Sequence, residues 1–345
     1  MGRVLLISSG ETSASAHEMF EHVFEDLRPP VRVAIMETPA GFEPNSALVA
    51  QRVSDFLKVT MKNYSPSINI VPVRRRDGPF STNSHDLLNP MLEADCLYLG
   101  AGSPSYLITH LRDTLAWRYL VGRHRQGAAI CLASAAAIAF GSRALPVYEI
   151  YKAGHDLHWL DGLDFFGRFG LDLAVVSHWN NREGGAQLDT SRCFMGRSRM
   201  ERLRKMLSPS TLVLGIDEYT GAILDFENET CHVAGKGGLT ILGRGPVETY
   251  AAGATFPIQR LGPYQRPPEV SEYGPLVEVA SEPEAEPVQA SQEAAVLLER
   301  RDQARRSGNW PEADSIRQQL SEMGFEIQDT PEGSRLYAKK ASRKA

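Results

Sequence analysis

The stretch GAAICLASAAAIAFG, residues 127–141, decides the fold. Residues 128–132 form a short apolar run after a glycine, which predicts a buried strand. Residues 135–140 are alanine-rich and free of proline, which predicts a helix. Ser134 lies at the join, where α/β enzymes expose a nucleophile on a sharp turn beside free helix N–H groups. Ser134 is therefore a candidate nucleophile, and N-capping of the helix is the alternative role.

Length and composition indicate a soluble globular chain. Its 345 residues suffice for one large domain and a smaller part, and 42% of them are hydrophobic. The net charge of -5 gives no overall attraction for nucleic acid. No signal peptide and no membrane span is expected. The four cysteines form no C-x-x-C pair, which argues against a zinc site or a disulfide scaffold and fits the cytoplasm. We expect no metal and no cofactor.

The first half of the chain alternates between predicted strands and helices. This order predicts βαβ units and a parallel sheet, with the site beyond the C-terminal strand ends. The strands are expected at 4–7, 31–36, 68–73 and 96–99, and the helices at 15–27, 45–62, 85–93 and 105–121. Small residues that include a serine follow three strand ends, at 8–10, 100–103 and 133–136.

The second half has more antiparallel signals. A basic helix is expected at 197–207 and a polar loop at 182–195. Strands are expected at 148–152, 173–176, 211–216, 222–225, 231–234 and 240–242. The strand at 173–176 ends at His178, and the strand at 211–216 ends at Glu218.

Composition divides the chain into three parts. Residues 1–262 form the α/β domain, residues 263–289 a linker and residues 290–345 a C-terminal module. Within residues 265–290 there are five prolines, six glutamates and one basic residue, which predicts a disordered, self-repelling spacer. The module is expected to contain helices at 290–306 and 310–323, followed by a β-hairpin of 325–328 and 334–337.

Several short motifs of residues 2–255 resemble the peptidase S51 family, which includes dipeptidase E and cyanophycinase. That resemblance implies a mostly parallel class I glutamine-amidotransferase-like (flavodoxin-like) sandwich with a nucleophile elbow. The motifs are Ser9-Gly10-Glu11, Gly100-Ala101-Gly102-Ser103-Pro104, the segment 127–137 with Ser134-Ala135, the segments 171–178 and 197–203, and Gly215-Ile216-Asp217-Glu218.

The resemblance also implies a mechanism and a substrate class. Ser134 would be the nucleophile, His178 its general base and Glu218 the group that orients the histidine. The oxyanion would be bound by the amides of Ala135 and of Gly102 or Ala101. The substrate would be a small peptide or amide. An acidic, aspartyl substrate would suit three arginines that could border the site: Arg197, Arg199 and Arg202.

Departures from the family pattern leave an alternative open. Leu132 and Ala136 replace the two elbow glycines, Trp179 replaces a phenylalanine, and the polar segment 180–194 is inserted. The alternative is a non-catalytic binding protein on a hydrolase scaffold. Cys131 could imitate an amidotransferase nucleophile, but it lies inside the predicted strand and is interpreted as a core residue.

The C-terminal module resembles the C-terminal helical module of cysteinyl-tRNA synthetase. The pattern includes Asn309-Trp310, Ala313-Asp314, Ile316-Arg317 and Gly324. The ATP-binding motifs of that enzyme are missing, so synthetase activity is not expected. The resemblance implies contact with tRNA, although residues 291–345 carry ten basic and nine acidic residues, and a stability or interaction module is the alternative. The arginines that could follow phosphates are Arg300, Arg301, Arg305, Arg306 and Arg317.

Overall fold

The computed structural model describes residues 1–243, 245–267, 292–307, 309–330 and 333–338. The chain divides into two compact units, Met1–Leu276 and Val277–Ala345. Most of the predicted acidic linker, from residue 268 onward, lies outside the described residues. None of the helices in the described ranges is long and apolar enough to cross a membrane.

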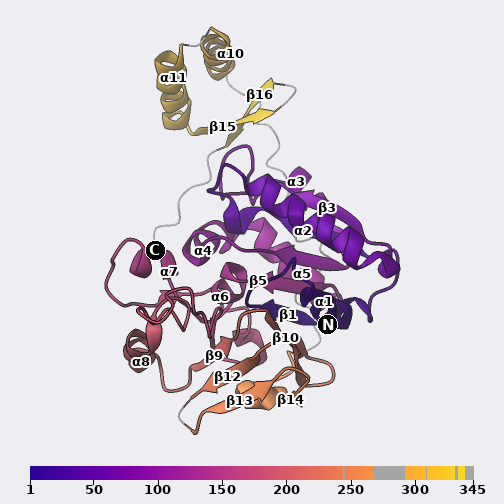
Figure 1. The fold of residues 1–345 in the computed structure, drawn as a ribbon. Coiled ribbons are helices and arrows are strands. Elements are labelled where there is room, and N and C mark those ends of the chain that lie inside the picture. The colour runs from indigo at the N-terminus through magenta and orange to yellow at the C-terminus, as the bar shows by residue number, and fades with distance from the viewer. Residues whose placement is uncertain (244, 268–291, 308, 331–332, 339–345) are drawn as a thin grey trace. The chain divides into compact units, whose positions relative to one another are not determined.

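The first unit is built on an eight-stranded sheet (Figure 1). Five strands are parallel, as predicted, and three more continue the sheet in antiparallel fashion beside β1. In spatial order the strands are β14 (Thr255–Pro257), β11 (Thr230–Gly235), β10 (Thr220–Asp225), β1 (Val4–Ile7), β5 (Ala129–Ala133), β4 (Cys96–Leu99), β2 (Arg32–Met36) and β3 (Ser67–Val71).

A second, four-stranded sheet supplies the other half of the candidate site. Its order is β13 (Glu248–Ala251), β12 (Gly238–Leu242), β9 (Leu212–Ile216) and β8 (Leu173–Val176). Strands β8 and β9 are parallel, with Val176 opposite Gly215, so both end on the same side. A short pair, β6 (Arg143–Ala144) and β7 (Leu160–Asp161), was not predicted, nor were β13 and β14.

Helices surround the sheets of this unit (Figure 1). They are α1 (Ala16–Phe24), α2 (Ser46–Thr60), α3 (His85–Leu92), α4 (Pro104–Leu111), α5 (Leu115–Arg125), α6 (Ala135–Ala139), α7 (Val147–Tyr151) and α8 (Gly196–Lys205). Side chains alternate along a strand, so Leu5 and Ile7 of β1 face the same side as Tyr98 of β4. Helices α1 and α2 cover that face and complete the core.

Two predicted elements were wrong. The helix expected at 105–121 is two helices, because Asp113 takes a φ of 56° and Thr114 then accepts a hydrogen bond from the amide of Trp117 at the start of α5. The strand expected at 148–152 is helix α7, in which Val147 and Ile150 are both buried. A spacing of three residues puts both side chains on one side of a helix and on opposite sides of a strand.

The second unit is a helical hairpin followed by a β-hairpin, as predicted. Helices α10 (Gln292–Arg306) and α11 (Trp310–Glu322) precede strands β15 (Phe325–Thr330) and β16 (Gly333–Ala338). Gly324, with a φ of 86°, follows the end of α11, which is the usual place for a left-handed glycine. The small core of the second unit contains Ala294, Ile316, Leu320 and Leu336.

Candidate active site

Ser134 occupies a strained turn between β5 and α6. Its φ of 50° and ψ of -107° lie outside the ordinary regions for a residue with a side chain. The turn is held because its amide donates to the carbonyl of Ile7 at 2.8 Å and its carbonyl accepts from Ile138. The hydroxyl makes no capping hydrogen bond to α6, so the capping alternative is not seen. Leu132 and Ala136, which replace the elbow glycines, are completely buried.

His178 follows β8 and faces Ser134. Its Nε2 lies 3.0 Å from Oγ of Ser134, and its Nδ1 lies 3.2 Å from Oε1 of Glu218. The residue takes a φ of 53°, and its amide donates to Oγ of Ser8 at 2.6 Å. The serine after β1 therefore orients the histidine backbone. The three side chains come from two sheets rather than from one sheet edge, which the alternating pattern of the first half could not indicate.

Glu218 follows β9 and is held by two asparagines that the sequence did not suggest. Nδ2 of Asn181 donates to Oε1 of Glu218 at 3.0 Å, and the amide of Glu218 donates to Oδ1 of Asn180 at 2.8 Å. The hydrogen bond with His178 lowers the pKa of the Glu218 carboxyl, and Asn181 adds to this against the effect of burial. The available signal was the Asn-Asn pair directly after His178-Trp179.

Trp179 connects the histidine strand to the glutamate strand. A Cβ on Gly215 would lie 2.3 Å from Cδ2 of Trp179, so the glycine of the Gly-Ile-Asp-Glu motif makes room for the indole. The guanidinium of Arg192 lies 3.9 Å from the indole ring centre, and its Nη1 donates to the Trp179 carbonyl at 2.7 Å. Arg192 is thus a cation fixed on Trp179, the residue after His178, and it comes from the polar loop that the sequence left without a role.

The predicted oxyanion loop lies next to the elbow. Leu99 of β4 pairs with Leu132 of β5, so the residues that follow, Ala101 and Gly102 in one chain segment and Ala135 in the other, leave the sheet side by side. Gly102 has a φ of 151°, and a Cβ there would lie 1.9 Å from the carbonyl oxygen of Pro39. This loop is therefore closely packed on the short helix η1 (Thr38–Ala40).

A small cavity of about 20 Å³ lies beside this loop, roughly the space that one water molecule occupies. Its wall includes Glu11, Glu37, Gly100 and Ala101. Tyr98 also borders it, and the hydroxyl of Tyr98 is completely buried and has no hydrogen-bond partner among the described residues. The cavity can therefore accept a small hydrogen-bonding group.

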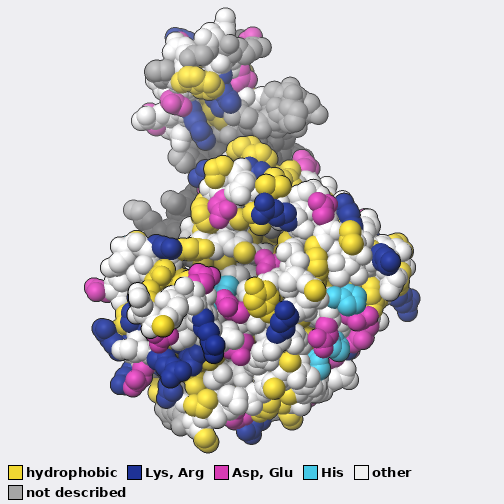
Figure 2. All heavy atoms as spheres, in the orientation of Figure 1, with side chains coloured by type: hydrophobic (Ala, Val, Ile, Leu, Met, Phe, Trp, Pro, Cys, Tyr) yellow, Lys and Arg dark blue, Asp and Glu magenta, His cyan; other side chains and the backbone are white. Residues whose placement is uncertain are grey.

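In the described part of the chain, the three arginines predicted to border the site make no polar contact with its catalytic candidates. The guanidinium of Arg199 donates to the carbonyls of Phe194 and Met195, both at 2.7 Å. Arg197 and Arg202 are exposed on α8, where Lys and Arg side chains gather in Figure 2. Among the described residues, no hydrogen bond or ion pair joins any of the three to Ser134 or His178.

Cys131 is a core residue, in agreement with its interpretation from the sequence. Its Sγ is completely buried and lies 3.6 Å from Sγ of Cys96. This contact and burial both raise the pKa of the Cys131 thiol. Cys193, closer to the site, is also buried, and burial together with Glu218 raises its thiol pKa to about 12. Neither cysteine has the thiolate character of a nucleophile.

Comparison with solved structures supports the peptidase-like fold. A peptidase from an acI-B1 Actinobacterium superposes with a TM-score of 0.59, over 74% of this chain and 97% of that chain. The two sequences are 19% identical, so the likeness concerns the fold.

Sequence comparison finds proteins that are similar to the C-terminal unit. Residues 289–337 match the cysteinyl-tRNA ligase anticodon binding domain. A cysteine–tRNA ligase from Lactobacillus helveticus (strain DPC 4571) is 54% identical over 39 residues, which is 11% of this chain and 8% of the ligase. One from Photorhabdus laumondii subsp. laumondii is 50% identical over 38 residues, again 11% and 8%. The chain therefore spans less than a tenth of the length of these ligases.

Proposed function

We propose that the first unit is a serine hydrolase that cleaves small peptides or amides. The supporting observation is the hydrogen-bonded series Ser134–His178–Glu218, with distances of 3.0 Å and 3.2 Å. His178 takes the proton of the Ser134 hydroxyl as the oxygen attacks the carbonyl carbon, and Glu218 stabilises the imidazolium that forms. His178 then donates that proton to the leaving amine. Water hydrolyses the acyl-enzyme by the same steps.

The oxyanion of the tetrahedral intermediate binds to backbone amides in this proposal. The amide of Ala135 starts α6, and its partner is the amide of Gly102 or Ala101. Close packing of Gly102 on Pro39 supports a rigid loop, which favours catalysis because the donors need no reorganisation.

An acidic substrate is favoured by Arg192 rather than by the arginines of α8. Its guanidinium is held above Trp179, next to His178 in the chain, by a ring contact and a hydrogen bond. A fixed guanidinium binds a carboxylate with two parallel hydrogen bonds. The substrate proposed is therefore a small peptide with an aspartyl residue next to the scissile bond.

The test is hydrolysis of matched dipeptides by the full chain. Asp-Leu and Asn-Leu have nearly the same shape and differ in charge. We expect wild type to prefer Asp-Leu, Ser134→Ala to hydrolyse neither, and Arg192→Gln to lose the preference for Asp-Leu. Arg202→Gln on α8 is the matched control and should keep it. Equal hydrolysis by wild type and Ser134→Ala would exclude the proposed nucleophile.

We propose a second function, tRNA association, for the C-terminal unit. The match of residues 289–337 to an anticodon binding domain supports it. Trp310 is 58% exposed, and the guanidinium of Arg305 lies 6.0 Å from its ring centre. An unpaired base can stack on such an arrangement.

The other arginines of this unit differ in exposure. Arg317 is exposed. Arg301 is 4% exposed and donates to Asp302 and Ser334, so Arg301 has a structural role. The side chain of Arg306 lies outside the description.

The test is an electrophoretic shift of the full chain with tRNA. Wild type should bind more weakly as salt rises, because phosphate contacts release counterions. Trp310→Ala and Arg317→Gln should each weaken binding several-fold, and Arg204→Gln on α8 should not. Binding that is equal in all four proteins would contradict a role of this unit in binding tRNA.

A further inference from the structure

A cluster of potential metal ligands lies on α1 and β11, outside the candidate active site. Glu18 and His22 are four residues apart on α1 and therefore project from the same face. His232 reaches them from β11, and one ligand atom of each residue lies within 4.8 Å of the other two. Figure 2 shows histidine and acidic side chains gathered over the region of α1.

His232 is oriented as a metal ligand usually is. Its Nδ1 hydrogen-bonds with Oγ1 of Thr255 at 2.8 Å, on the neighbouring strand β14. Its Nε2 is buried and has no hydrogen-bond partner in the described part of the chain. The rings of His22 and His232 are 4.4 Å apart. A buried ring nitrogen without a partner is rare, because desolvation without a hydrogen bond destabilises the fold.

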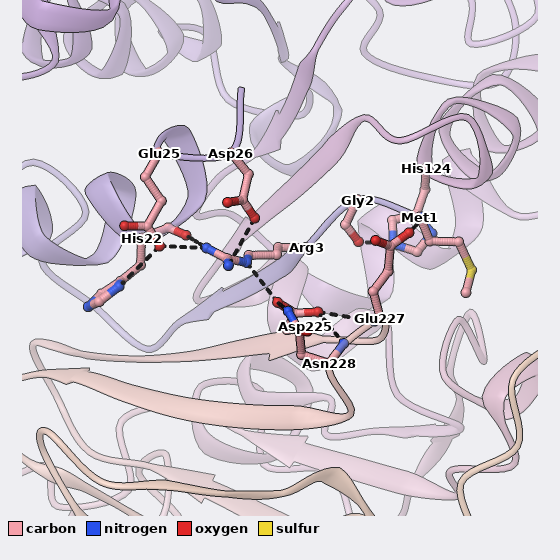
Figure 3. A network of polar contacts seen from close by, with 10 residues as sticks. All are labelled: Met1, Gly2, Arg3, His22, Glu25, Asp26, His124, Asp225, Glu227 and Asn228. Carbon is pink, nitrogen blue, oxygen red and sulfur yellow. Dashed lines mark hydrogen bonds and ion pairs between the residues drawn. The ribbon is translucent and has the colours of Figure 1, made fainter. Parts of the chain in front are cut away.

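His22 also has an outer partner. Its Nδ1 lies 3.7 Å from Oε1 of Glu25, and Figure 3 shows the other ring nitrogen pointing away from that carboxylate. A carboxylate behind a metal-binding imidazole fixes the ring and raises its basicity. Nε2 of His22 is thus left for a ligand.

The nearby Arg3 does not make the cluster cationic. Its guanidinium donates to the carbonyl of His22 and forms ion pairs with Glu25 at 2.7 Å, Asp26 at 2.9 Å and Asp225 at 3.1 Å (Figure 3). Three carboxylates around one guanidinium leave the region acidic, which favours a bound cation.

We propose that Glu18, His22 and His232 bind one Zn²⁺ ion, with water as the fourth ligand. Two imidazoles and a carboxylate are a common zinc donor set. In a tetrahedral site the donor atoms lie about 3.3 Å apart, and the exposed side chain of Glu18 is free to move inward. The ion would attach α1 to strand β11. The expectation of no metal rested on the cysteines alone, so this group of two histidines and a glutamate was not predicted.

The experiment is zinc titration of the tag-free full chain after removal of metal with a chelator. In competition with a chromophoric chelator, we expect one Zn²⁺ per chain with micromolar or tighter affinity, and zinc should raise the unfolding temperature by a few degrees. His232→Gln and His22→Gln should each lower the affinity at least tenfold and abolish the shift in unfolding temperature. Glu18→Gln, at an exposed position, provides a variant that should fold normally and bind more weakly.

Two control variants make the result specific. His17→Gln changes an exposed histidine of the same helix and should bind zinc like wild type. His178→Gln tests whether zinc binds at the candidate active site instead. The proposal is overturned if Glu18→Gln, His22→Gln and His232→Gln all bind zinc like wild type, or if wild type shows no binding at micromolar zinc.

Discussion

At the scale of single residues, the proposed nucleophile and its proposed base both have an unusual backbone conformation. Ser134 has a φ of 50° and His178 a φ of 53°, and neither is a glycine. Such conformations cost about 1–3 kcal/mol each and persist only when their surroundings hold them. Ile7 and Ser8, at the end of β1, bind the amides of these two residues. One strand end therefore positions both members of the proposed nucleophile–base pair.

Glu218 gives the first prediction at this scale. Glu218→Gln keeps the size of the side chain but removes the charge that would stabilise the imidazolium of His178. We expect the kcat/KM for dipeptide hydrolysis to fall about 10³-fold. The unfolding temperature should stay within a few degrees of the wild-type value. Glu183→Gln, an exposed residue of the polar loop, is the control and should retain full activity. An active Glu218→Gln would mean that this carboxylate has no catalytic role.

At the scale of elements, the oxyanion loop depends on how closely it packs on η1. Gly102→Ala would place a Cβ 1.9 Å from the carbonyl oxygen of Pro39 and must displace the loop. We expect a loss of 1–3 kcal/mol, as an order of magnitude, in the free energy of unfolding and a loss of about 10²-fold in kcat. Urea unfolding and steady-state kinetics measure the two effects.

The matched control is Gly245→Ala, because a Cβ there would have no heavy atom within 4 Å. This variant should unfold and turn over like wild type. A Gly102→Ala protein that behaves like Gly245→Ala would contradict the tight packing of the loop.

The sequence predicted elements well where one period dominated. Buried apolar runs such as 128–132 and 96–99 became β5 and β4, as expected for short runs that are bounded by a glycine, Gly127 before the first and Gly100 after the second. The predicted elements differ from the structure where a single residue breaks the pattern. Asp113 interrupts an otherwise helical run, and the apolar residues of 147–151 are too few for a period to be recognised.

The candidate site was predictable only in part, for a related reason. Motif residues Ser134, His178 and Glu218 could be named, and the structure brings them within hydrogen-bond distance, while their catalytic roles stay a prediction. Asn181 and Arg192 could not be named. They lie in or beside an aperiodic polar loop, and only the tertiary fold brings that loop back onto His178 and Trp179.

At the scale of the whole molecule, His124 links acid stability to the packing of the first unit. It is 1% exposed, and its Nε2 lies 2.8 Å from the carbonyl oxygen of Gly2 (Figure 3). Three aromatic rings surround it, those of Phe165, Phe169 and Phe226. Burial, together with nearby Arg168 and Arg125, lowers the pKa of His124 to about 3.

This shift predicts a pH dependence with a definite sign. The pKa is about 6.5 in the unfolded chain and about 3 in the folded one, so the unfolded state binds more protons between these values. Above about pH 6.5 His124 is neutral in both states and does not lower the free energy of unfolding. As the pH falls from there toward 3, the free energy of unfolding decreases by up to about 1.4 kcal/mol per pH unit. Urea unfolding at pH 7.5, 6.0 and 5.0 should therefore show a shallower pH dependence in His124→Gln than in wild type. The same pH dependence in both proteins would contradict the lowered pKa of His124.

The central claim is that Ser134 is an activated nucleophile. The most direct measurement is labelling of the full chain with a fluorophosphonate probe, which reacts with activated serines, in wild type, Ser134→Ala and His178→Ala. The account predicts that wild type is labelled and that both variants are not, with Ser105→Ala labelled as a control. Absence of labelling in folded wild type, or labelling that survives in Ser134→Ala, would contradict the account.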